Sequence, residues 1–220
     1  MRKILLGLSI IGMAFLASCG SKATITASDE QEAAMASTEA VEYTVNTAVS
    51  AVNWRGFKIF HDSSRPETGH YGFVKLKDGI LTMKGGVLES GKIVADQTTF
   101  ESVDKNDDPD TKTKLDTHLR SSDFLDIEKF PEATFEITGV KTLTEGDFST
   151  EISGNLDFRG VPKNISFKAN VKEDGDKITI KSEEFQINRQ EFGIVYQSKG
   201  GDSLIKDEVA LQVDITAEKK

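Results

Sequence analysis

The chain has 220 residues and a formal net charge of −9, and 37% of its residues are hydrophobic. This acidic balance argues against a surface built to bind nucleic acid or an anionic membrane, because such surfaces need an excess of Lys and Arg. Thirteen Phe accompany only one Trp and three Tyr, and since Phe carries no polar group, this excess predicts a large apolar interior.

The first 18 residues have the pattern of a bacterial lipoprotein signal peptide. Two basic residues precede an apolar run over 4–16, which is too short to span a bilayer. Small residues then lead to Cys19, the only cysteine, as in a bacterial lipobox. This resemblance implies cleavage after residue 18 and a lipid on Cys19 that anchors the protein in the cell envelope. Gly20 favours the outer membrane, facing the periplasm. An ordinary secretory signal with an incidental cysteine is the alternative.

Residues 19–40 are predicted to form a flexible tether. They are rich in Ala, Ser, Thr and Glu and show no apolar period, so they cannot bury enough surface to order themselves. Removal of the signal peptide would also remove two basic residues and change the net charge to −11. One domain over 41–218 remains, a size at which a single hydrophobic core is usual.

Alternating strands dominate this domain. Apolar and polar residues alternate over 152–158, 165–171 and 209–215, so each of these strands has one apolar and one wet face. Asp78-Gly79 and 173–176 are predicted as hairpin turns. About eight to ten antiparallel strands with polar outer faces favour a barrel or a sandwich, and an eight-stranded barrel can enclose one ligand.

A single helical pattern interrupts the strands. Leu115 and Leu119 lie four residues apart, and a second turn starting at Ser122 would end before Pro131. We therefore expect a short helical crossing near 111–128. The side chains expected to fill the space between the two halves of the sheet structure, as plugs, are Leu119, Phe124 and Phe130.

Motifs for catalysis or metal binding are missing from the sequence. His61, His70 and His118 have no partner at metal-ligand spacing, and Pro109 stands where a calcium loop starting at Asp104 needs glycine. Neither a phosphate-binding glycine loop nor a serine nucleophile motif occurs. We expect no metal and no catalytic residues, and hence a binding protein rather than an enzyme. An apolar stripe alone leaves open whether the barrel is packed solid or holds a lipid.

Three strings resemble the YceI-like family of bacterial periplasmic proteins. The first is HLRS, DFL, KFP and TF within 118–135, the second is GNLDFRGVPK at 154–163, and the third is RQEFGI at 189–194. VNWRG at 52–56 and GHYG at 69–72 also fall where related members have similar motifs. The resemblance covers 41–217 in the family's order.

This resemblance implies an all-β, lipocalin-like antiparallel barrel whose apolar interior holds a polyisoprenoid or similar lipid, with no other cofactor. The apolar candidates for lining that interior are Trp54, Phe57, Phe73, Phe100, Leu119, Phe124, Phe130, Phe135, Phe158, Phe167, Phe185 and Phe192. The polar candidates for its mouth, where an arginine could pair with a phosphate head, are His118, Arg120 and Arg189.

Several alternatives stay open from sequence. The protein could instead be a structural or stress-linked envelope adaptor with a filled barrel and a protein partner. An enzyme acting on prenyl or lipid substrates would need a convergent polar cluster inside the cavity, and the sequence displays none. The expected partners are a lipid ligand and, through Cys19, a membrane. A homodimer is possible, because several family members form dimers.

Overall fold

The computed structural model describes residues 24–198 and 201–220. The predicted signal peptide and the predicted lipidation site Cys19 lie outside these residues. None of the helices in the described part of the chain is long and apolar enough to cross a membrane.

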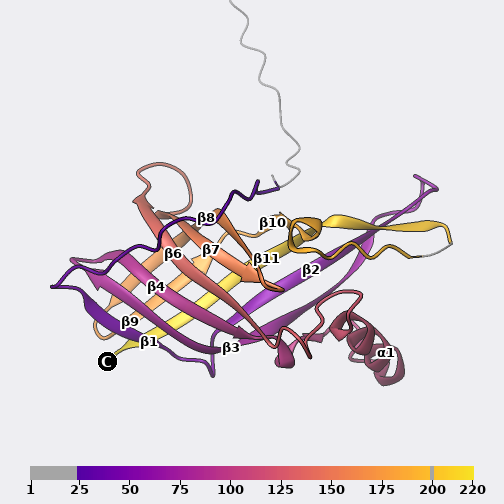
Figure 1. Ribbon diagram of the computed structural model, residues 1–220, viewed down its shortest axis with the longest axis horizontal. Coiled ribbons are helices and arrows are strands. Elements are labelled where there is room, and N and C mark those ends of the chain that lie inside the picture. Colours follow the sequence, from indigo (N-terminus) through magenta and orange to yellow (C-terminus); the bar gives the residue numbers. More distant parts are fainter. Residues whose placement is uncertain (1–23, 199–200) are drawn as a thin grey trace, which may run out of the picture.

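Strands make up most of the described chain (Figure 1). The strands are β1 (Val41–Val45), β2 (Ala51–Phe60), β3 (Thr68–Lys84), β4 (Val87–Asp96), β5 (Glu101–Ser102), β6 (Glu132–Thr142), β7 (Thr150–Phe158), β8 (Val161–Asp174), β9 (Lys177–Ser182), β10 (Phe185–Asn188) and β11 (Ser203–Lys219). The helices are α1 (Pro109–Arg120) and the short 3₁₀ turns η1 (Gln97–Thr99) and η2 (Arg189–Phe192).

The strands close into an antiparallel barrel with eight strand positions. Strand β11 pairs with β2 on one side and with β9 on the other, which joins the two ends of the sheet. Strands β1 and β2 occupy one position in succession, because both lie between β11 and β3. Strands β9 and β10 likewise follow each other along β11. The predicted all-β barrel is confirmed.

Glycines at two-residue turns set the register of the hairpins. Gly85 and Gly86, both with positive φ, join β3 to β4, and Arg159-Gly160 joins β7 to β8 in the same way. The predicted turn at Asp78-Gly79 is wrong, because β3 runs through it with only a bulge. Gly79 serves packing instead, since a Cβ there would lie 2.6 Å from a methyl group of Val45.

The helical crossing is shorter than predicted. Asp108, whose carboxylate accepts a hydrogen bond from the Thr111 amide, caps α1, and Pro109 takes the first helical position, which suits its fixed φ. The helix ends at Arg120 rather than 128, because Ser121 is extended and Asp126 has a φ of +50°. Residues 121–130 therefore form a chain of turns.

Two polar contacts fasten α1, which buries no residue of its own, to one end of the barrel (Figure 1). The Asp116 carboxylate accepts from the Ser102 amide at 2.9 Å and from Lys112 at 2.7 Å. Burial raises the pKa of Asp116, but these hydrogen bonds outweigh it and leave the pKa below its usual value. Arg120 donates from Nε to the Phe100 carbonyl at 3.0 Å.

The barrel wall has a seam between the first half of β8 and β10. In the described part of the chain, these two strands form no hydrogen-bonded ladder with each other. Residues 24–28 lie in this seam. The Ile25 amide donates to the Gln186 carbonyl of β10 at 2.7 Å, and Ser28 and Asn164 of β8 exchange two hydrogen bonds of 2.9 Å. Ile25 and Ala27 pack against the barrel core.

The same segment then crosses the outside of the barrel to β1 (Figure 1). Gln31 is held by the Asn155 side chain of β7, and the Ala34 amide donates to the Ile137 carbonyl of β6 at 2.8 Å, where a bulge interrupts the ladder. We call residues 24–37 the N-terminal strap. The predicted flexible tether is therefore wrong for the described residues 24–37, because backbone partners on the barrel order a segment of small side chains.

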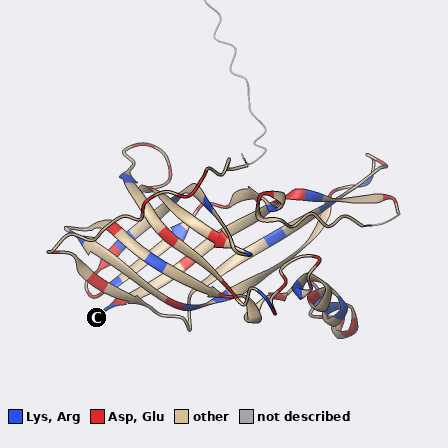
Figure 2. Cartoon of the chain, in the orientation of Figure 1, with Lys and Arg blue, Asp and Glu red and all other residues tan. Residues whose placement is uncertain are grey.

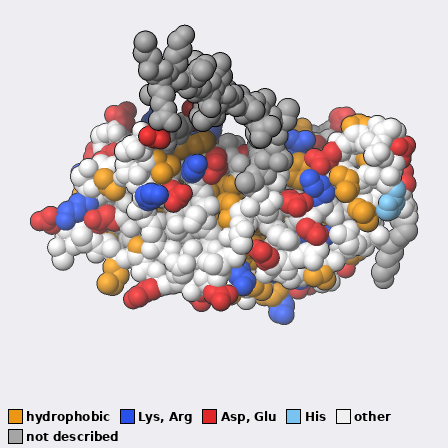
Figure 3. All heavy atoms as spheres, turned by 90° about the horizontal axis from the view of Figure 1, so that it is seen from above, with side chains coloured by type: hydrophobic (Ala, Val, Ile, Leu, Met, Phe, Trp, Pro, Cys, Tyr) orange, Lys and Arg blue, Asp and Glu red, His pale blue; other side chains and the backbone are white. Residues whose placement is uncertain are grey.

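Charged side chains lie along the outer faces of the strands and gather on α1 (Figure 2). On the face seen in Figure 3, acidic, basic and apolar side chains are intermixed. Most of the buried apolar residues of the barrel strands instead point inward and belong to one large core cluster. The chemistry that distinguishes this molecule therefore lies inside the barrel.

Candidate functional site

The barrel interior contains an elongated apolar cavity. Its 25 lining residues come from all eight strand positions and from Gln97, Phe100 and Leu125 at one end. The cavity that they enclose has a volume of about 150 Å³. Nearly all of its lining side chains are apolar, so the cavity suits a hydrocarbon chain.

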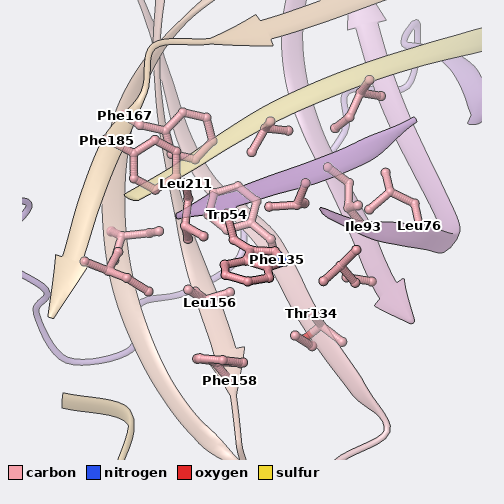
Figure 4. A pocket seen from close by; sticks show the side chains of 18 of the residues that line it. Trp54, Leu76, Ile93, Thr134, Phe135, Leu156, Phe158, Phe167, Phe185 and Leu211 are labelled. Carbon is pink, nitrogen blue, oxygen red and sulfur yellow. The ribbon is translucent and has the colours of Figure 1, made fainter. Parts of the chain in front are cut away.

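Several aromatic rings belong to the cavity wall (Figure 4). Phe167 of β8 and Phe185 of β10 stack with centroids 4.7 Å apart, and Phe135 of β6 lies 5.5 Å from Phe167. Near the other end, Trp54 of β2 stacks on Phe100 at 4.6 Å and an interplanar angle of 15°. A ligand in this cavity would run between flat apolar surfaces.

Strand alternation places these side chains inside. Residues two apart on β7 and β8 share a face, so Leu156 and Phe158 join Ile152, and Phe167 joins Ile165, on the cavity wall. Gly154 is the exception that shapes the wall. A Cβ at this position would lie 2.3 Å from Cζ of Phe135, so glycine makes room for that ring.

A second apolar cluster closes the end beside α1. Trp54, Val74, Phe100 and Leu125 are its buried members, and Leu125 is 8% exposed and also lines the cavity. Leu119 and Phe124 pack on this cluster without lining the cavity. The residue of this segment that fills the end of the cavity is therefore Leu125, because the turns after α1 direct its side chain inward.

Six of the twelve apolar candidates line the cavity. They are Trp54, Phe100, Phe135, Phe158, Phe167 and Phe185. The structure brings these together from β2, β6, β7, β8, β10 and the segment after η1.

The other six lie elsewhere. Phe57 and Phe73 occupy strand positions opposite in parity to Trp54 and Val74 and do not line the cavity. Phe57 is nevertheless buried, with the charged ends of Arg55 and Lys206 over its ring. Phe192 is fully buried behind Phe158, with ring centroids 5.7 Å apart. The remaining three lie around the turns after α1. Leu119 and Phe124 pack on the second apolar cluster, and Phe130 packs against Gly160.

The polar candidates have other partners. Arg189 is buried and donates to the Lys206 and Ile194 carbonyls and to Asp207, and burial lowers its pKa. Arg120 donates twice to the Phe100 carbonyl.

The third polar candidate, His118, lies outside the cavity. Its Nε2 lies 3.1 Å from Asp123, and its ring packs edge-on against Phe124 and Tyr196. The three polar candidates therefore form no common site. Within the described residues, no group of His, Cys, Asp or Glu could hold a metal ion.

Most of the lining was missed from sequence because it is aliphatic. Val52, Leu76, Ile93, Ile180, Val213 and Ile215 are examples. The signal that could have found them is parity, because each lies on the inward face of its strand. The two polar lining residues, Gln97 and Thr134, had no such signal, because Gln97 belongs to a 3₁₀ turn.

Comparisons with known proteins agree with this architecture. A model of the YceI-like domain matches residues 43–217. Protein YceI of Salmonella arizonae is 39% identical over 106 residues, which are 48% of this chain and 51% of that protein. The chain thus spans about half the length of the curated relatives it matches.

Solved structures share the fold at low identity. BcnA of Burkholderia cenocepacia is similar with a TM-score of 0.57 and 16% identity, over 78% of this chain and 98% of that one. A domain from Saccharophagus degradans, described as polyisoprenoid-binding and implicated in plant cell wall breakdown, gives 0.53 and 12% identity over 82% and 99%. Since the domain model covers most of the sequence, as the motifs indicated, this chain belongs to the family of YceI-like domains.

Proposed function

We propose that the protein binds a polyisoprenoid or a similar amphiphilic lipid inside the barrel and carries, stores or sequesters it. The observation that carries this proposal is the cavity wall, which draws on all eight strand positions and, among the described residues, includes no charged side chain. A similar fold in a domain described as polyisoprenoid-binding supports the proposal. The role is binding without catalysis.

The energetics favour a long apolar guest. Each methylene group that moves from water into an apolar cavity contributes about 0.8 kcal/mol. A chain of tens of carbons therefore gains enough to offset the cost of ordering it. Because the cavity of about 150 Å³ is smaller than such a chain, the guest must displace side chains such as Phe135 and Phe185 from their contacts with Phe167. We expect lipid binding to move these rings while the strands keep their register.

The place of action in this proposal is the bacterial cell envelope. Lipidation of Cys19 after removal of residues 1–18 would hold the protein on a membrane, most simply the outer membrane on its periplasmic side. Since the strap holds residues from 24 onward on the barrel, few residues would separate the lipid from the barrel. In this arrangement, the barrel would lie close to the membrane that supplies its ligand.

Mass spectrometry of an organic extract tests the proposal. Protein purified without delipidation should release an isoprenoid or related lipid in near-stoichiometric amount. Leu156→Trp should abolish this, because it fills the cavity. Ser153→Trp is the matched control, since it lies on the opposite face of the same strand. Equal lipid content in the two folded variants would contradict binding inside the barrel.

The small volume of the cavity favours one alternative, an envelope adaptor with a filled barrel. The ligand-free cavity has a volume of about 150 Å³, which is smaller than a chain of tens of carbons. An adaptor would release no lipid and would bind its protein partner equally well with Leu156→Trp, since that change leaves the outer face intact.

A further inference from the structure

The seam between β8 and β10 is held together by fewer hydrogen bonds than the ladder beside it. Every residue of β7 is paired with β8, whereas three backbone hydrogen bonds between described residues join the strap to the two edges of the seam. The Ile25 amide donates to the Gln186 carbonyl at 2.7 Å, and Ser28 and Asn164 exchange two bonds of 2.9 Å. Segments with few backbone hydrogen bonds open locally at a lower free energy than paired strands. We therefore expect the seam to open before the ladders do.

The cavity lies directly behind the seam. Phe167 of β8 and Phe185 of β10 face each other across it, with ring centroids 4.7 Å apart and an interplanar angle of 3° (Figure 4). Ile165 and Ile187 lie on the inward faces of the same strands, and all four side chains line the cavity. Behind the strap, the two strands are thus joined by apolar side chains. Separation of these side chains exposes the cavity without breaking a strand ladder.

The strap covers the seam from outside. Ile25 and Ala27 are half-buried and pack on the barrel core, whereas residues 24, 26 and 28 are exposed. This alternation is that of a short strand with one wet face. None of the described strap residues lines the cavity. Since Gln31 and Ala34 have separate partners on β7 and β6, residues 24–28 can leave the seam while the rest of the strap stays in place.

Side chains fill the two ends of the barrel. At the end beside α1, the second apolar cluster described above covers the cavity. At the other end, three side chains continue the inward faces of β3, β9 and β11 beyond the cavity, and none of them is more than 1% exposed. They are Met83, Ile178 and Ala217. A lipid that entered through either end would have to separate a close-packed cluster, whereas the seam requires the separation of one pair of strand edges.

We propose that the lipid enters and leaves the cavity sideways through this seam, and that residues 24–28 of the strap detach to let it pass. This inference rests on the proposed function and adds the route that its ligand takes. Water takes over the hydrogen bonds of the exposed seam edges when the strap detaches, which limits the cost of opening. The chain then passes between Phe167 and Phe185, and the strap returns once the lipid lies inside.

A disulfide across the seam tests this route. Ser28 and Asn164 are antiparallel partners that exchange two hydrogen bonds, and the Cα atoms of such partners lie about 5.5 Å apart, which a disulfide can bridge. Ser28→Cys with Asn164→Cys therefore locks the strap when oxidised and frees it when reduced. Cys19 is the only native cysteine, so Cys19→Ala in the full chain leaves the new pair as the only thiols. The oxidised and reduced forms of one protein are compared, which cancels any effect of the substitutions themselves.

The measured quantity is the rate at which delipidated protein takes up the isoprenoid alcohol geranylgeraniol from phosphatidylcholine vesicles. Protein is separated from the vesicles at timed intervals, and its lipid is quantified by mass spectrometry. We expect oxidation to slow uptake at least about tenfold, because the strap can no longer open locally. The final lipid content should be unchanged, since neither Ser28 nor Asn164 lines the cavity.

Two further variants complete the test. Ser153→Cys with Ser166→Cys is the matched control, because these residues are partners on the outer face of the β7–β8 ladder with their hydroxyl oxygens 2.6 Å apart. Its oxidation should change the uptake rate less than about twofold, since that ladder stays closed in any case. Ile25→Ser weakens the contact of the strap with the core and should speed uptake severalfold without changing the final lipid content.

The outcomes separate this route from lipid binding itself. If the unmodified protein takes up no lipid and releases none on extraction, the proposed function fails, and this inference fails with it. If lipid is taken up equally fast by the oxidised and reduced forms of the Ser28–Asn164 pair, or if Ile25→Ser has no effect on the rate, lipid binding stands and entry through the seam is refuted. Equal slowing by the control disulfide would also refute it, because rigidity of the whole barrel would then explain the effect.

Discussion

Asn155→Ala tests how firmly the N-terminal strap belongs to the fold. The Asn155 side chain accepts from the Gln31 amide at 3.0 Å and from the Asn164 side chain at 2.9 Å, and it donates to the Gln31 carbonyl at 2.6 Å. Each such hydrogen bond contributes about 0.5–1.5 kcal/mol net. The residue is buried beneath the strap. We therefore expect the variant to lose about 2–4 kcal/mol of unfolding free energy.

Urea denaturation gives this change as a lower midpoint at an unchanged slope. Asn53→Ala is the matched control, because Asn53 is exposed on the outer face and makes no hydrogen bond through its side chain within the described residues. That variant should lie within about 0.5 kcal/mol of the unchanged protein. Hydrogen exchange should also accelerate at the amides of Ser28 and Ala34. Full stability of Asn155→Ala with both amides still protected would refute the reasoning.

Three further outcomes follow from side chains described above. Gly154→Ala should destabilise the barrel by about 1–3 kcal/mol, because its methyl group would overlap Phe135; thermal unfolding measures this, and no change would show that the ring moves freely. Asp116 has a lowered pKa in the folded protein, so its contribution is present above its unfolded pKa of about 3.9 and is lost as the pH falls further; an acid titration of Asp116→Asn should lack that loss. The hydrogen bond to Glu173 raises the pKa of Tyr43 to about 12, so its contribution is complete below its unfolded pKa of about 10 and disappears as the pH rises toward 12; an alkaline titration of Tyr43→Phe should lose this step.

Strand alternation and turn glycines predicted the barrel because both are local signals. Residues 152–158 and 165–171 alternate, and the structure places their apolar members inside. The same logic failed at Asp78-Gly79, where glycine makes room for Val45 across the sheet. A close approach between distant residues leaves no local pattern, so turn and packing glycines look identical in the sequence.

The strap and the plug show the same limit for long-range contacts. Residues 24–37 are polar and small, and their order depends on carbonyls and amides of β6, β8 and β10 that composition does not reveal. Leu125 and Phe124 are neighbours of equal hydrophobicity, yet only Leu125 enters the cavity, because the left-handed Asp126 and the turns around it set the direction of the chain. The aromatic candidates on strands could be sorted by parity alone, and those after α1 could not.

The structure of the protein saturated with geranylgeraniol tests the central claim most directly. We predict continuous density for the chain between Phe135, Phe167 and Phe185, with those rings displaced. An interior unchanged from the ligand-free state, with the lipid bound on the outer face or nowhere, would contradict the account.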